Sequence, residues 1–239
     1  MQRYFAQNFN LKENVITLSS DDIFHISKVM RMRVGDTFEC VADGKIFLCE
    51  ITSFTPFLFK IAAELNENHE ICGFIRLLYC VPKGEKLDLV IQKATELGVN
   101  EIVLINSERS VAKIEKDKKE KKLERFNKII KEASEQSKRS SLMKLTDVIS
   151  FSEISKYKAD INLLAYEKSD QNLDEVEQIL HSAKGKIINV IVGAEGGISP
   201  KEVEICNANN YKIISLGKRV LRSETACFYI LSLLSFYMD

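Results

Sequence analysis

The stretch Val190–Glu202, VIVGAEGGISPKE, contains the transition that decides the fold. A run of β-branched apolar residues enters a glycine-rich turn. Ser199, Pro200 and Glu202 then have the pattern of a helix start, with an N-cap, a proline at the first helical position and a capping box. The stretch predicts a buried strand, a loop over Gly193–Ile198 and a helix. In open parallel sheets such loops bind ligands at the carboxyl ends of strands, and glycines let a ligand approach the backbone.

The glycine-rich turn differs from the known phosphate-binding loops. It matches neither the G-x-G-x-x-G fingerprint nor the P-loop pattern. Glu195 places a carboxylate inside the loop, which disfavours a phosphate and suits a neutral or positively charged ligand. A purely structural turn and a ligand-binding loop are both compatible with this pattern taken alone.

A second apolar run meets a glycine loop in Ile213–Ala226, IISLGKRVLRSETA. This loop carries three cations, Lys218, Arg219 and Arg222, and Ser223 is placed to cap the last helix. Two adjacent strand-end loops, one acidic and one basic, predict a pocket. The cations suit a polyanionic substrate. A solvated loop that happens to be basic is the alternative.

The sequence changes character near residue 70. Residues 1–70 contain short β-type runs, a turn at Ala42-Asp43-Gly44 and one amphipathic stretch, Asp21–Met30, in which Asp21 could cap a helix. We predict a small, mainly β barrel there. The expected strands are Thr37–Val41, Ile46–Ser53 and Leu58–Leu65.

From residue 71 onward, strand-like runs alternate with helical stretches. The expected strands are Phe74–Val81, Glu101–Ile105, Ile161–Ala165, Lys186–Val192 and Lys212–Leu216. The expected helices are Leu87–Leu97, Lys116–Ser137 and Leu173–Ala183, with Ser223–Met238 as the last. This alternation predicts a largely parallel sheet with helices on both faces.

The composition excludes several classes of protein. The 239 residues include 34 basic and 34 acidic side chains, and 45% are hydrophobic, so a disordered chain and a histone-like basic tail are excluded. No apolar run is long enough to span a bilayer, and no signal peptide opens the chain, which predicts a cytoplasmic protein without a membrane partner. The six cysteines form no C-x-x-C pair and the three histidines are scattered, so no metal site is predicted.

The last predicted helix, Ser223–Met238, is apolar almost all round. A helix without a polar face must be covered on every side. At a chain end a second subunit is an economical cover, which favours a homodimer. Burial within the monomer is the competing interpretation.

Taken together, these stretches resemble one family, the RsmE-type 16S rRNA uridine N3-methyltransferases of the SPOUT superfamily. The resemblance runs nearly end to end, and the order and spacing of its motifs make it specific. The motifs are Met1–Phe5, His25–Asp36, Lys83-Gly84, Gln92–Val99, Glu108–Ser110, Glu132–Gln136, Gly193–Pro200 and Leu216–Ala226.

The resemblance implies an α/β fold with two domains. Residues 1–70 would form a PUA-like β-barrel that docks RNA. Residues 71–239 would form a SPOUT methyltransferase domain that holds the cofactor site, the dimer interface and a C-terminal trefoil knot. General rules would not predict the knot, since knotted connections are normally excluded. The implied cofactor is S-adenosylmethionine, and the implied partners are 16S rRNA in the small ribosomal subunit and a second copy of the chain.

The resemblance also implies roles for individual residues. Arg222 is the first candidate to stabilise the anion that develops on uridine, Glu195 could orient it, bind near the sulfonium or take the proton, and Thr225 would hydrogen-bond nearby. The cofactor-binding candidates are Leu164, Ala165, Glu167, Gly193, Glu195, Gly196, Gly197, Leu216, Gly217, Val220 and Leu221. The RNA-binding candidates are Arg3, Arg31, Arg33, Lys83, Arg109, Lys138 and Arg139.

Two positions depart from the family pattern, and two other functions stay open. Ala194 replaces the usual proline of the glycine-rich turn, and Ser140–Lys144 lacks the proline that tends to follow Arg139. One alternative function is a non-catalytic rRNA-docking assembly module. The other is a SPOUT methyltransferase acting on tRNA or on a ribose 2′-hydroxyl, against which the His25–Asp36 motif argues.

Overall fold

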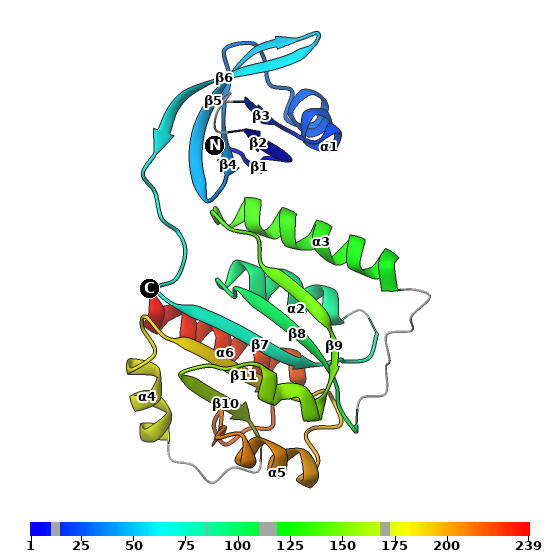
Figure 1. The fold of residues 1–239 in the computed structure, drawn as a ribbon, viewed down its shortest axis with the longest axis vertical. Helices are drawn as coiled ribbons and strands as arrows, with labels where there is room; N and C mark the ends of the chain where they lie inside the picture. Colours follow the sequence, from blue (N-terminus) through cyan, green and yellow to red (C-terminus); the bar gives the residue numbers. More distant parts are fainter. Residues whose placement is uncertain (11–14, 85, 110–118, 168–172) are drawn as a thin grey trace. The chain divides into compact units, whose positions relative to one another are not determined.

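The computed structural model describes residues 1–10, 15–84, 86–109, 119–167 and 173–239 (Figure 1). The chain divides into two compact units. Unit 1 contains Met1–Glu70 and the later segment Ser134–Leu142, and unit 2 contains Ile71–Ala133 and Met143–Asp239. Unit 1 is therefore built from two pieces that lie far apart in the sequence.

Unit 1 is built on a four-stranded sheet in the order β1-β4-β5-β6. Strands β4, β5 and β6 are antiparallel neighbours, and β1 pairs with β4 in parallel. Asp43 and Gly44 join β4 to β5 with φ angles of 49° and 73°, as a two-residue hairpin turn requires, which confirms the predicted turn. The strands are β1 Arg3–Phe5, β4 Thr37–Ala42, β5 Lys45–Phe54 and β6 Phe57–Leu65, with a separate hairpin of β2 Asn8–Asn10 and β3 Val15–Thr17.

The helix predicted in unit 1 is present, but its N-cap lies two residues earlier than predicted and its second half is a π-helix. Helix α1, Ser20–Phe24, is capped by Ser19, whose side chain accepts from the amide of Asp22, so the expected cap at Asp21 is wrong. The capping box between Ser19 and Asp22 satisfies two helix-end groups at once. The chain then continues as a π-helix, η1, His25–Val29.

A buried ion network joins the two pieces of unit 1. Arg3 is fully buried, and its Nε donates to Glu39 Oε2 at 2.7 Å, while its Nη1 donates to the carbonyl oxygen of Lys138. Lys138 Nζ reaches the same carboxylate at 2.8 Å. Arg139 is also buried and pairs with Glu70 at 2.9 Å. Since a buried charge is costly without a partner, these pairs fix Ser134–Leu142 within unit 1.

Unit 2 contains a six-stranded, all-parallel sheet in the order β12-β10-β11-β7-β8-β9. This confirms the predicted parallel sheet, and every predicted strand from residue 71 onward is found. The sheet has one strand more than predicted, the edge strand β9. The strands are β7 Phe74–Cys80, β8 Glu101–Asn106, β9 Lys144–Ser150, β10 Ile161–Ala165, β11 Ile187–Val192 and β12 Lys212–Ile214.

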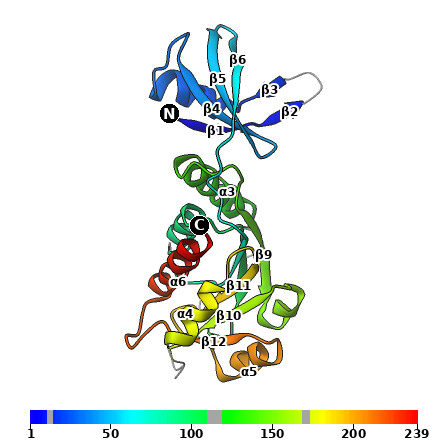
Figure 2. The same cartoon turned by 90° about the vertical axis from the view of Figure 1, so that its left-hand side faces the viewer.

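Helices cover both faces of this sheet (Figure 2). The larger apolar core lies between the sheet and α2, α3, α4 and α6, and the smaller one between the sheet and the 3₁₀ helix η3 with α5. The helices are α2 Lys86–Glu96, α3 Lys119–Gln136, η3 Phe151–Lys156, α4 Leu173–His181, α5 Pro200–Ala208 and α6 Ser223–Met238.

A polar row closes the sheet at the amino ends of its strands. The strand register places five polar residues side by side across β10, β11, β7, β8 and β9. They are Asn162, Asn189, Arg76, Glu101 and Lys144. Arg76 donates to Glu101 at 2.6 Å and to Asn189 at 2.9 Å, and its guanidinium lies over the Tyr157 ring. The side chains of Arg76, Glu101, Asn189 and Asn162 form hydrogen bonds with one another at this end of the sheet.

Helix α6 is covered on most but not all of its surface. Cys227, Ile230, Leu231, Leu234 and Met238 are fully buried in the larger core of unit 2. On the outer side, Tyr229 is 45% exposed and Phe236 is 77% exposed. Burial within the unit thus covers one broad face of the helix and leaves an aromatic stripe in solvent.

Candidate functional site

A pocket of about 360 Å³ lies where three strands of unit 2 end. The residues after β10, β11 and β12 line it, together with the first turn of α6. These are adjacent strands of a parallel sheet, so their carboxyl ends meet at one edge. The lining includes Ala165–Glu167, the glycine turn (Gly193–Ile198), the basic loop (Leu216–Arg222), Ser223 and Ala226, apart from Lys218 of the basic loop.

Close packing explains the glycines of the glycine turn. A Cβ on Gly196 would lie 2.8 Å from Arg109 Cβ and 2.9 Å from the Arg109 carbonyl oxygen, which is closer than real side chains approach. Gly197 has a φ of +69°, a backbone conformation that favours glycine. Ser199 caps α5 after the turn, with Pro200 in the first turn and Glu202 completing the capping box, as predicted.

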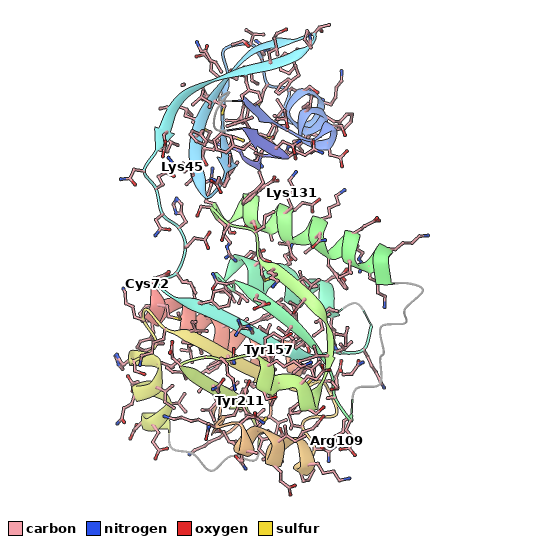
Figure 3. The ribbon with its side chains drawn as sticks, in the orientation of Figure 1. Lys45, Cys72, Arg109, Lys131, Tyr157 and Tyr211 are labelled. Carbon is pink, nitrogen blue, oxygen red and sulfur yellow. The ribbon has the colours of Figure 1, made fainter. Side chains whose placement is uncertain are left out.

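Arg109, labelled in Figure 3, follows β8 and hydrogen-bonds to the glycine turn. Its guanidinium donates to the carbonyl oxygens of Gly196 and Ile198, at 3.2 and 3.4 Å. The buried carboxylate of Glu202 accepts from the amides of Ser199 and Glu108, both at 2.8 Å. The segment after β8 and the start of α5 are thereby locked together. The resemblance implied that Arg109 contacts RNA. In the structure its guanidinium donates hydrogen bonds to the glycine turn.

Ser223 ties the basic loop to the glycine turn. Arg222 is the N-cap residue of α6 and Ser223 is its first helical residue, so the expected cap at Ser223 is wrong. The Ser223 hydroxyl donates instead to the Gly193 carbonyl oxygen at 2.5 Å, and it pairs with the buried Tyr79 hydroxyl at 2.8 Å. The Ser223 hydroxyl thus joins the start of α6 to the glycine turn. No local sequence pattern indicates this contact.

Glu195 is held as an ionised carboxylate. Lys86 Nζ lies 3.1 Å from its Oε1, and the Lys83 amide donates to its Oε2 at 3.3 Å. Partial burial alone raises the pKa of Glu195, but hydrogen bonds from its own amide, from Lys86 and from Lys83 outweigh burial and lower the pKa. The contacts of Lys86 with Glu195 and Glu224 raise the pKa of its own ammonium group, and Lys86 was not among the predicted site residues.

The basic loop is open to solvent. Val220 is 83% exposed, and the side chains of Lys218, Arg219 and Arg222 are exposed as well. Within the described part of the chain, none of these three cations forms an ion pair with a carboxylate. The cations are therefore available to an anionic ligand.

The structure brings together most of the predicted cofactor-binding residues. The ones that line the pocket are Ala165, Glu167, Gly193, Glu195, Gly196, Gly197, Leu216, Gly217, Val220 and Leu221, and the catalytic candidate Arg222 lines it too. Two predicted residues do not line it. The side chain of Leu164 is buried in the smaller core, and Thr225 is exposed in the first turn of α6. Sequence reasoning missed Lys86, Ser223 as a link, and Glu224.

The predicted RNA-binding cations fall into two groups. Arg31 and Arg33 in unit 1 and Lys83 and Arg109 in unit 2 are exposed. Arg3 and Arg139 are buried and paired, and Lys138 is paired with Glu39. Arg3 and Arg139 have no exposed guanidinium to offer to a phosphate, because each fills a buried ion pair.

Among the described residues, no helix is long and apolar enough to cross a membrane. In the same ranges, no three side chains of His, Cys, Asp or Glu are grouped so that they could hold a metal ion.

The chain is similar to known proteins along its whole length. A family model described as an RNA methyltransferase domain matches residues 70–235, and one described as an RNA methyltransferase PUA domain matches residues 18–61. The ribosomal RNA small subunit methyltransferase E of Bacillus subtilis is 35% identical over 250 residues, covering 100% of this chain and 98% of its own.

Solved structures share the fold. A crystal structure of a hypothetical protein superposes with a TM-score of 0.88 at 34% identity, covering 100% of this chain and 99% of its own. A protein from Legionella pneumophila, described as a methyltransferase and solved with the bound cofactor SAM, has a TM-score of 0.86 at 28% identity. That match covers 97% of this chain and 96% of the Legionella protein.

Proposed function

Because this chain belongs to the ribosomal RNA small subunit methyltransferase E family of RNA methyltransferases, we propose that it methylates N3 of a specific uridine in 16S rRNA. The methyl donor is S-adenosylmethionine, and the substrate is the small ribosomal subunit. The observation that carries the proposal is the pocket itself, which is lined by Glu195 of the glycine turn and by Arg219 and Arg222 of the basic loop, neither of which forms an ion pair with a described carboxylate.

The pocket residues fit S-adenosylmethionine. A volume of about 360 Å³ is within the range of small-molecule sites, which are mostly apolar with a few placed polar groups. Ile198, Leu216 and Leu221 offer apolar surface for an adenine ring. Glu167 and Glu195 offer carboxylates to ribose hydroxyls and to a positive charge. When bound, the cofactor supplies an electrophilic methyl group on a sulfonium.

Glu195 acts in this proposal as a fixed anion rather than as a base. Its contacts with Lys86 and Lys83 lower its pKa, so it is ionised at neutral pH and is a weak proton acceptor. Of the three roles considered for Glu195, binding near the sulfonium is therefore favoured over taking the imide proton.

Arg222 stabilises the acceptor. Uridine N3 must lose its imide proton, and negative charge then develops on the adjacent carbonyl oxygens. A cation placed beside those oxygens lowers the energy of that anion. Arg222 lines the pocket, and its side chain is exposed. Thr225, in the first turn of α6, is also exposed and would donate a hydrogen bond to the RNA.

RNA recognition uses the exposed cations. N3 lies on the Watson–Crick edge, so the target base must be unpaired or flipped out. Phosphate contacts fix the register of the RNA, and Arg31, Arg33 and Lys83 are exposed for that role. Arg109 can contribute only from the side of its guanidinium that the glycine turn leaves free. We leave Arg3 and Arg139 out of this set because they are buried.

The finer fold features and the assembly belong to the same proposal. The resemblance implies that the sheet of unit 1 closes into a PUA-like barrel and that the chain around the pocket is knotted. The Ser223–Gly193 contact joins the start of α6 to the glycine turn. The exposed Tyr229 and Phe236 on α6 support a homodimer formed through this helix. A cytoplasmic location follows from the substrate.

Nucleoside analysis tests the proposal directly. We expect small-subunit rRNA from a strain lacking this protein to lack N3-methyluridine, and purified protein with labelled S-adenosylmethionine to restore it. Retention of N3-methyluridine in the deletion strain would contradict the proposal. Loss of a tRNA or ribose methylation in that strain would favour the other SPOUT function, and absence of cofactor binding would favour the non-catalytic module.

A further inference from the structure

Lys86 bridges two carboxylates that come from different walls of the pocket. It is the first residue of α2, and its Nζ lies 3.1 Å from Oε1 of Glu195 in the glycine turn. The same atom lies 3.2 Å from Oε2 of Glu224 in the first turn of α6. One cation therefore joins the turn after β11 to the helix that follows the basic loop.

The position of Lys86 runs against local helix preference. The N-terminus of a helix carries partial positive charge, so a lysine there is unfavourable unless nearby anions offset it. Glu195 and Glu224 provide that offset. A local conflict of this kind is expected where a residue serves a site rather than its own helix.

Among the described residues, Lys86 is the only one whose cationic side chain contacts Glu195. The Lys83 contact is made by a backbone amide, at 3.3 Å. Arg219 and Arg222 line the same pocket and form no ion pair with a carboxylate in the described part of the chain. Lys86 itself does not line the pocket, so it influences a ligand through the residues that it contacts, Glu195 in the glycine turn and Glu224 on α6.

We propose that Lys86 is a positioning residue, which fixes the Glu195 carboxylate on the pocket wall and ties the glycine turn to α6 before the cofactor binds. Preforming a site lowers the cost of ordering it on binding. The inference rests on the proposed function for the identity of the ligand, S-adenosylmethionine, whose positive charge suits a fixed carboxylate. The tie between the turn and α6 can be tested without any ligand.

The first measurement is calorimetry of S-adenosylmethionine binding to the full chain. Lys86→Met keeps the apolar stem and removes the charge, and we expect it to weaken binding about three- to tenfold. Lys86→Arg keeps the charge and should stay within about twofold of the parent protein. Lys93→Met is the matched control, since Lys93 forms an ion pair on the same helix with Glu96, away from the pocket. It should bind like the parent protein.

The second measurement is hydrogen–deuterium exchange of the protein without cofactor. We expect faster exchange in Lys86→Met for peptides covering residues 190–200, and parent-like exchange in Lys86→Arg and Lys93→Met. Glu224→Gln weakens the same bridge from α6 and should accelerate exchange in the same peptides. In turnover assays, the KM for S-adenosylmethionine should rise in Lys86→Met more than kcat falls. A purely structural defect would not give this split.

Several results would overturn the inference. One is parent-like affinity and exchange in Lys86→Met. Another is a loss in Lys86→Arg as large as in Lys86→Met, and a third is an equal loss in Lys93→Met. If the parent protein does not bind S-adenosylmethionine, the proposed function fails, and the exchange comparison still decides whether Lys86 holds the turn.

Discussion

The glycine turn and the basic loop both follow a buried parallel strand and both line the pocket, yet they are held very differently. Arg109, Ser223 and Lys86 fix the glycine turn through its carbonyl oxygens and its carboxylate. In the basic loop, Val220 is 83% exposed and the cations have no ionic partner within the described residues. The same pocket therefore has one preformed wall, the glycine turn, and one open wall, the basic loop.

Arg222→Ala gives the largest expected effect and tests the open wall. We expect kcat on small subunits to fall about a hundredfold, because a charge that stabilises the developing anion is lost. The affinity for S-adenosylmethionine should change little, and the circular dichroism spectrum should be that of the parent protein, since the side chain is exposed. Full activity in this variant would remove Arg222 from the mechanism.

Gly196→Ala tests the preformed wall. The new Cβ would lie 2.8 Å from Arg109 Cβ, so the turn must shift, at a cost of about 1–3 kcal/mol in stability. Binding of S-adenosylmethionine, measured by calorimetry, should weaken about tenfold or more.

Gly217→Ala is the matched change in the basic loop. Nothing lies within 4 Å of its new Cβ, and only its φ of +102° is unfavourable. We expect a smaller loss of cofactor affinity than in Gly196→Ala. Equal losses in the two variants would contradict the distinction between the two walls.

Ser223→Ala loosens the link between the walls. It removes the hydroxyl that donates to Gly193 and leaves the buried Tyr79 hydroxyl without that partner. We expect a loss of about 1–3 kcal/mol in the free energy of unfolding, measured with urea. Tyr79→Phe in the Ser223→Ala background should recover part of it, because no buried hydroxyl is then left unpaired. An additive double variant would show that the two groups are not coupled.

The smallest expected effect is a pH dependence that involves Glu195. Its folded pKa is lowered, so its contribution to stability is present above the unfolded pKa and is lost as the pH falls through the folded pKa. Thermal unfolding of the parent protein and of Glu195→Gln should differ at neutral pH and converge only below the ordinary range of a glutamate pKa. Convergence already near neutral pH would show that Glu195 is not held as an anion.

Local sequence patterns predicted most of the helices and strands. The capping box of Ser199 and Glu202 depends on residues three apart, and the apolar runs of β7, β8, β10 and β11 are long enough to recognise in the sequence. The strand β9 was missed because Lys144–Ser150, KLTDVIS, mixes polar and apolar residues at the edge of the sheet. Strands β1 to β3 are each three residues long, too short to show a period.

The site was predicted where it follows from strand ends, and missed where it depends on long-range contacts. The glycine turn and the basic loop stand out as glycine-containing segments after apolar strands. The bridge from Lys86 to Glu195 spans more than a hundred residues, and the contact from Ser223 to Gly193 joins the start of α6 to the glycine turn. The burial of Arg3 depends on partners at Glu39 and Lys138. No local rule distinguishes such a cation from one that faces solvent.

The two-piece composition of unit 1 has a consequence for how the protein is made. Synthesis delivers Met1–Glu70 first, while Arg3 still lacks the carbonyl oxygen of Lys138 and Glu70 still lacks Arg139. These partners leave the ribosome only after much of the chain for unit 2 has also been made. Until then Arg3 can pair with Glu39 inside the amino-terminal piece, whereas the carboxylate of Glu70 lacks Arg139 and must stay hydrated. Unit 1 is therefore completed only after more than half of the chain has been made.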